Sequence, residues 1–212
     1  MSTARATQPA TGAASRLPLV GLLLVQVFVG YEWFMSGLAK IVRGGFPSGL
    51  SKNLAERSSG AAHWYKSFLD GSIIPNATAF GYLIEIGELL IGIALIAAAL
   101  TWLLRWERLP HSGRLAVLAT TILAALGGIF MAVNFHIANG ATHPWLIPKS
   151  GFDESVDLDS LLPMVQLVLV GVSVAYWRSL RGSAPLTSRL RSRTSRLRSR
   201  FGSSHPPAHK GV

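Results

Sequence analysis

Four long apolar segments dominate the pattern of hydrophobic and polar positions along the chain. They cover residues 17–41, 76–104, 114–137 and 160–177. Each is close to or above the roughly 20 residues that an α-helix needs to cross the hydrocarbon core of a bilayer. The pattern predicts an all-α integral membrane protein, a four-helix bundle in which each segment spans the membrane once.

Composition supports this class. Of the 212 residues, 50% are hydrophobic and only 14% are charged, and the mean hydropathy is +0.38. An ordinary soluble domain is less apolar and more highly charged. The chain contains no cysteine, which excludes thiol redox chemistry, disulfides, iron–sulfur clusters and thiolate metal sites.

Basic residues predict the orientation of the spans. Basic residues lie before the first span, between the second and third spans, and densely after the fourth span: Arg5, Arg16, Arg105, Arg108, Arg114 and the run from Arg178. Acidic residues gather before the fourth span: Asp153, Glu154, Asp157 and Asp159. The positive-inside rule then makes both termini cytoplasmic and the protein a multi-pass protein of the cell (cytoplasmic) membrane. Four cations of the first connection, residues 42–72, count against this orientation.

The chain divides into three parts. Residues 1–15 are small and polar and are predicted to be disordered, and residues 16–178 form the membrane domain. Residues 179–212 form a basic cytoplasmic tail in which Ser-Arg-Leu-Arg-Ser-Arg occurs at 188–193 and again at 195–200. We expect this tail to be either a disordered topogenic segment or a binder of anionic lipid head groups. Nucleic acid is not expected as a partner, because aromatic residues do not alternate with the arginines.

The second span carries Glu85 and Glu88 in a run from Ala77 to Leu103 that has no other charge. Burying one carboxylate in a membrane costs roughly 2.5–3.5 kcal/mol on insertion scales. With Gly81 and Gly92 the two glutamates form one stripe at helical spacing, so the stripe should face the protein interior or a wet cavity. We expect Pro75 to end any preceding helix and Asn76 to cap this one.

Polar residues in the first and third spans predict the rest of a pocket. In the first span, Phe28, Glu32, Ser36 and Lys40 recur every four residues, with Tyr31 beside them, and the third span carries Gly127, Met131, Asn134 and His136. We expect an outward-opening cavity between spans one, two and three. Its candidate catalytic residues are Glu32, Glu85 and Glu88, and its candidate binding residues are Lys40, His136, Asn134 and Tyr31.

Two other interpretations of these polar residues stay open. Buried Glu and Asn side chains can serve only to hold helices together. A metal site at Glu85, Glu88 and His136 is disfavoured, because the Glu-x-x-His spacing of such sites is absent, and neither a metal nor a haem is expected. The aromatic segment from Asn53 to Leu69 would form a short helix, acting as a lid over the cavity or as an interfacial anchor.

Two motifs resemble those of a known family. Residues 30–41 read Gly-Tyr-Glu-Trp-Phe-Met-Ser-Gly-Leu-Ala-Lys-Ile, and residues 85–92 read Glu-Ile-Gly-Glu-Leu-Leu-Ile-Gly. They resemble the first-span and second-span signatures of DoxX/DoxD-type membrane proteins, and the resemblance covers residues 17–178. The chain departs from that pattern in two places: the region just ahead of Gly30 offers only Gln26 where an Arg is usual, and Glu88 stands where a Gly is usual.

This resemblance implies two functions on one scaffold. The first is the membrane subunit of a quinone-linked oxidoreductase, with thiosulfate oxidised and a quinone as acceptor. Glu85 and Glu88 would then supply protons, Lys40 would attract the thiosulfate anion, and His136 would donate to a quinone carbonyl. Because no haem or cluster ligands are evident, a second subunit or a soluble redox partner is expected. The alternative is a non-catalytic membrane scaffold or partner of a redox-stress enzyme.

Overall fold

The computed structural model describes residues 17–139 and 158–182. The sequence predictions for the N-terminal segment 1–15 and for the repeated Arg-rich hexamers lie outside the described residues. Contacts divide the chain into two units, Met1–Trp177 and Arg178–Val212. Everything below concerns the first unit, apart from the last turns of the fourth long helix.

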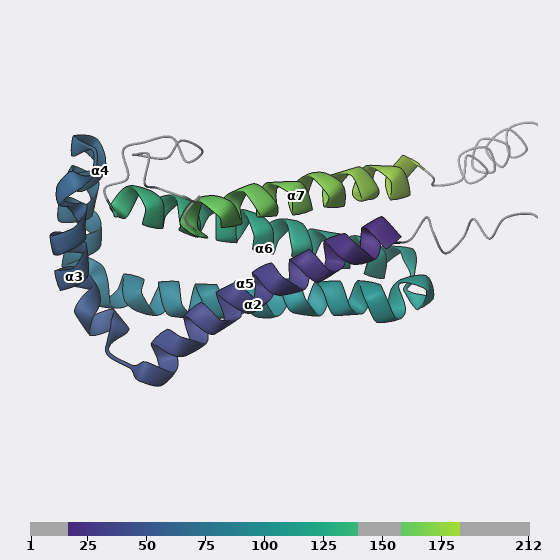
Figure 1. Ribbon diagram of the computed structural model, residues 1–212, viewed down its shortest axis with the longest axis horizontal. Helices are drawn as coiled ribbons and strands as arrows, with labels where there is room; N and C mark the ends of the chain where they lie inside the picture. The colour runs from purple at the N-terminus through teal and green to yellow at the C-terminus, as the bar shows by residue number, and fades with distance from the viewer. Residues whose placement is uncertain (1–16, 140–157, 183–212) are drawn as a thin grey trace, which may run out of the picture. The chain divides into compact units, whose positions relative to one another are not determined.

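Four long helices form the bundle (Figure 1), and they are α2 (Leu17–Arg43), α5 (Ala77–Arg105), α6 (His111–Ala138) and α7 (Leu158–Gly182). All four are long and apolar enough to cross a membrane. The described residues contain no strand. The predicted all-α membrane bundle is confirmed. The helix ends agree with prediction to within three residues, except that α7 continues five residues past Trp177.

Glycines bring α2 and α5 into backbone contact. A Cβ atom added to Gly37 would lie 2.5 Å from the amide nitrogen of Leu89 and 2.8 Å from the carbonyl oxygen of Glu85. Gly92, one of the predicted stripe, packs in the same way against the backbone of Phe34. Such close approach maximises the van der Waals contact that holds helices together in lipid. The predicted stripe therefore does face another helix.

Gln26 joins three helices in the interior. Its side-chain amide nitrogen donates to the carbonyl oxygen of Leu95 on α5 at 3.0 Å and to the Thr121 hydroxyl on α6 at 3.2 Å. Gln26 is buried, so these hydrogen bonds satisfy a polar group that would otherwise be costly in a membrane. The apolar core packs around this region, between α2, α5, α6 and α7.

The helix α7 packs on the bundle through one small residue and one aromatic contact. Gln166 is fully buried, and its amide lies where a side chain at Gly128 on α6 would be. Tyr176 meets Trp102 of α5 edge to face, with ring centroids 5.1 Å apart. This aromatic contact ties α7 to α5 within the bundle.

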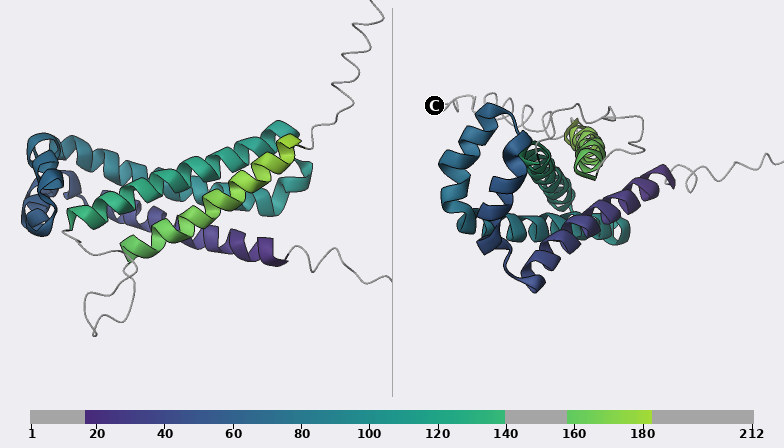
Figure 2. Two further views of the ribbon diagram at one scale, coloured as in Figure 1. Left: turned by 90° about the horizontal axis from the view of Figure 1, so that it is seen from above. Right: turned by 60° about the vertical axis from the view of Figure 1, so that its left-hand side comes forward.

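Short helices cross one end of the bundle between α2 and α5 (Figures 1 and 2). The chain leaves α2 through Gly44 and Gly45, both left-handed with φ of 69° and 76°. This conformation suits glycine because other residues are strained there. It then forms α3 (Phe46–Arg57), a 3₁₀ turn η1 (Ser58–Gly60) and α4 (His63–Phe68). We call residues 46–68 the cap.

The expected helix break at Pro75 is wrong. A π-helical turn η2 (Leu69–Ile73) and a 3₁₀ turn η3 (Ile74–Asn76) lead from α4 into α5 without interruption. Pro75 lies at the start of the 3₁₀ turn, where its missing N–H leaves no helical bond unmade. Asn76 precedes α5 but makes no capping bond, because its side-chain nitrogen donates back to the carbonyl oxygen of Ser72 at 3.0 Å. At the other end of α5, a 3₁₀ turn η4 (Trp106–Arg108) leads to α6.

Candidate functional site

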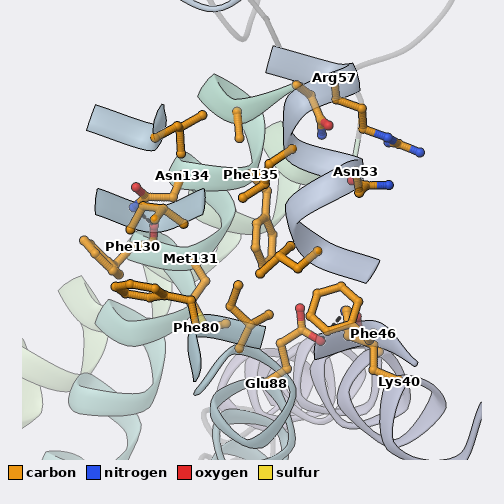
Figure 3. Close-up of a pocket in the computed structure, with 18 of the residues that line it drawn as sticks. Lys40, Phe46, Asn53, Arg57, Phe80, Glu88, Phe130, Met131, Asn134 and Phe135 are labelled. Carbon is orange, nitrogen blue, oxygen red and sulfur yellow. Dashed lines mark hydrogen bonds and ion pairs between the residues drawn. The ribbon is translucent and has the colours of Figure 1, made fainter. Parts of the chain in front are cut away.

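A cavity of about 470 Å³ lies beneath the cap, among α2, α5 and α6. Figure 3 shows side chains from all of these elements pointing into it. Its walls are mainly aromatic and aliphatic, and the aromatic members are Trp33, Phe46, Tyr65, Phe68, Phe80, Phe130 and Phe135. The volume falls within the roughly 300–1,000 Å³ of typical small-molecule sites. The predicted cavity between spans one, two and three is therefore present.

A buried ion pair joins two of the cavity's walls. The Lys40 ammonium on α2 pairs with the Glu88 carboxylate on α5 (Figure 3). Lys40 also donates to the Ser36 hydroxyl at 2.8 Å and lies 5.2 Å from the ring centre of Phe46. The Glu88 side chain is 1% exposed and that of Lys40 is 22% exposed. A carboxylate so deeply buried needs this cation, since an unpaired charge in low dielectric is very costly.

The pairing changes the roles predicted for both residues. Lys40 is not a free cation, because Glu88 neutralises it. Glu88 is in turn committed to the Lys40 ammonium. Glu32 also lines the cavity from α2, and no ion pair to it is found among the described residues. Glu32 is therefore a second carboxylate of the cavity, separate from the Lys40–Glu88 pair.

Asn134 connects the cavity wall to the cap. The Tyr65 hydroxyl on α4 donates to the side-chain oxygen of Asn134 at 3.1 Å, and it lies 3.2 Å from the Asn134 carbonyl oxygen. The Asn134 side-chain nitrogen donates to the carbonyl oxygen of Phe130 at 2.7 Å. Tyr65 lies in the cap, outside the spans, and its burial raises the pKa of the phenol above the ordinary value. It therefore remains a donor, and the cap is attached to α6 by this bond.

A second contact fixes the cap on α5. The ring of Pro47 in α3 packs directly against Gly81, so closely that a side chain at position 81 would overlap it. Farther along α3, Asn53 and Arg57 line the cavity at its polar end (Figure 3). The predicted helix in the first connection is therefore present and covers the cavity.

The structure brings together four of the seven predicted site residues. Glu32, Lys40, Glu88 and Asn134 line the cavity. Glu85, His136 and Tyr31 do not: Glu85 and His136 are buried elsewhere, and Tyr31 is 54% exposed. Tyr31 is directed away because the face of α2 next to it, at Gly30 and Gly37, is the one that packs on α5.

The aromatic wall was predicted only in the part of the cap that falls in the segment from Asn53 to Leu69. Among its members Phe80, Phe130 and Phe135 lie in spans where many residues are large and apolar, so nothing in composition separates a cavity phenylalanine from a lipid-facing one. One signal was present, since Phe130 and Asn134 are four residues apart and therefore share a helix face. The described residues contain no cluster of three or more His, Asp or Glu side chains that could hold a metal ion.

Comparison with family models, with curated proteins and with solved structures found no match for this chain.

Proposed function

We propose that the protein is a quinone-binding membrane subunit of an oxidoreductase, with the cavity beneath the cap as the quinone site. The carrying observation is the Lys40 ammonium on the wall of an aromatic cavity set among membrane-spanning helices. Lys40 has three N–H donors. Two of them go to Ser36 and Glu88, which leaves one for a ligand.

A quinone suits the site in both shape and polarity. Its flat ring matches the aromatic walls, and its two carbonyl oxygens accept hydrogen bonds without bringing a net charge into the membrane. Lys40 and Asn134 line different parts of the cavity, one on α2 and the other on α6 (Figure 3). We assign Lys40 as the donor to one carbonyl and Asn134 as the polar group near the other.

The proton chemistry is assigned to Glu32. Reduction of a quinone to a quinol takes up two electrons and two protons. Two thiosulfate ions supply those two electrons when they join through a new sulfur–sulfur bond. Thiosulfate is therefore the first electron donor to test. The chain offers a proton-exchanging carboxylate at the cavity in Glu32, while the electrons arrive from thiosulfate directly or through a partner subunit.

The test uses purified protein in lipid nanodiscs. Quinone binding is followed by quenching of tryptophan fluorescence, and turnover by quinone absorbance after thiosulfate is added. We expect Lys40→Met to weaken binding about tenfold, as is usual when one charge-assisted hydrogen bond is lost. We expect Glu32→Gln to preserve binding and to slow turnover by about 10²-fold or more. The control is Glu56→Gln, the same change on the exposed surface of the cap.

Each result decides a specific point. Failure of the folded wild-type protein to bind quinone would overturn the proposal. Binding without turnover, in the presence of thiosulfate, would favour the alternative in which the protein is a non-catalytic membrane partner of a redox enzyme. Equal effects of Glu32→Gln and Glu56→Gln would remove Glu32 from the proton chemistry.

A further inference from the structure

Among the described residues of the four long helices, Phe130 alone both lines the cavity and is exposed. Phe130 lines the cavity and is nevertheless 70% exposed, so its ring lies at an opening. Phe80 of α5 lines the cavity beside it (Figure 3). We call the part of the cavity wall formed by Phe80 and Phe130 the portal.

The packing of α5 on α6 places the portal at the flank of the bundle. The two helices pack at Gly87 and Gly127, where added Cβ atoms would lie 3.6 Å from the Met131 sulfur and 3.5 Å from the Ile91 Cδ1 atom. Phe80 on α5 and Phe130 on α6 both line the cavity, so the portal is formed by two side chains.

The portal lies at the depth of lipid chains. Phe130 is eight residues before Ala138, the end of α6, which is about 12 Å at 1.5 Å per residue. The helix α6 has 28 residues, or about 42 Å, and extends about 6 Å beyond each side of a hydrocarbon core of about 30 Å. Phe130 is then about 6 Å inside the hydrocarbon.

At its capped end the cavity is lined by the exposed residues Asn53, Arg57 and Asn139, and the cap itself is held by stronger contacts. Opening it would break the Tyr65–Asn134 hydrogen bond and would lift Pro47 out of its contact with Gly81. Opening the portal requires only rotation of a phenylalanine side chain, which takes picoseconds to nanoseconds in exposed residues.

From these contacts we infer that the ligand reaches the cavity sideways from the lipid, through the portal, and that it carries a long hydrocarbon tail. The head lies between Lys40 and Asn134, and the tail leaves between Phe80 and Phe130 into the bilayer. This inference rests on the proposed quinone site and specifies the class of quinone, one with an isoprenoid tail.

The first experiment compares two quinones of the same ring, one with a long isoprenoid tail and one with no tail, binding to protein in nanodiscs. Phe130→Trp narrows the portal and should slow association of the tailed quinone about tenfold, as expected for a restricted approach, with little effect on the tail-free one. Phe130→Ala should restore or increase the association rate. The control is Phe28→Trp, because Phe28 is 74% exposed on α2 and does not line the cavity.

Equal slowing of both quinones, or an effect of Phe28→Trp as large as that of Phe130→Trp, would overturn the portal. A second measurement decides the matter even if the protein binds no quinone. The chain has no cysteine, so Ile84→Cys in the cavity wall can carry a single spin label. Faster relaxation by oxygen dissolved in the lipid than by a water-soluble nickel chelate would support the portal, whereas the reverse would show that the cavity opens to water.

Discussion

Removing Lys40 should destabilise the protein more than removing Glu88. The Glu88 side chain is 1% exposed, so Lys40→Met leaves a buried carboxylate without its cation. Breaking a buried pair in this way costs about 3–5 kcal/mol, and the 22% exposure of Lys40 places the loss near 3 kcal/mol. Glu88→Gln should cost less, about 2 kcal/mol, because Lys40 keeps its contacts with Ser36 and Phe46.

A double variant measures the interaction energy of the Lys40–Glu88 pair apart from the other contacts of each residue. Lys40→Met with Glu88→Gln removes both charges together, so we expect a total loss of only about 2 kcal/mol and a coupling energy of about 3 kcal/mol. The assay is unfolding of the purified protein by a denaturing detergent, followed by circular dichroism and supported by thermal melts. A loss of 3 kcal/mol should lower the midpoint by roughly 6–12 °C in a domain of this size.

Two results would refute this reasoning. If the losses of the two single variants add to that of the double variant within about 0.5 kcal/mol, the two charges are not coupled. If Lys40→Met costs less than about 1 kcal/mol, the carboxylate is either neutral or solvated in the native protein, since a surface ion pair is worth no more than this.

Two further predictions concern the packing of the bundle and the attachment of the cap. Gly37→Ala forces a Cβ to within 2.5 Å of the Leu89 amide nitrogen, so it should lower the free energy of unfolding by about 1–3 kcal/mol in a detergent titration. The control Gly21→Ala, with nothing within 4 Å, should be neutral or slightly stabilising. Equal effects of the two substitutions would argue against close contact between α2 and α5. Tyr65→Phe removes the hydrogen bond to Asn134. Amide hydrogen exchange across residues 46–68 should then become faster, because local opening of the cap becomes easier by about 1 kcal/mol. Unchanged exchange there would show that this bond does not hold the cap.

The number and limits of the spans could be predicted because length and hydropathy are local properties. The face formed by Glu85, Glu88 and Gly92 could also be predicted, because helical spacing is local as well. The partner of Glu88 could not. Lys40 is 48 residues away, and periodicity gives the depth of each residue but not which helices touch.

The part of the aromatic wall that lies in the spans and the continuous helical path through Pro75 could not be predicted from the sequence, for different reasons. Phe28 and Phe130 are both apolar residues within spans, yet only Phe130 lines the cavity, because that depends on which helix faces pack together. Pro75 ends many helices, but here a π-helical turn precedes it and a 3₁₀ turn contains it, so the chain continues without a break. A sequence pattern alone does not distinguish these outcomes.

The contact between Gly128 and Gln166 has a consequence for how this sequence can diverge. The Gln166 amide occupies the space that any side chain at position 128 would need. The side-chain size that fits at position 128 therefore depends on the residue at position 166. A larger residue at 128 requires the Gln166 amide to move or position 166 to become smaller, whereas a smaller residue at 166 alone leaves a cavity beside Gly128. The effects of substitutions at 128 and 166 on stability should therefore not be additive.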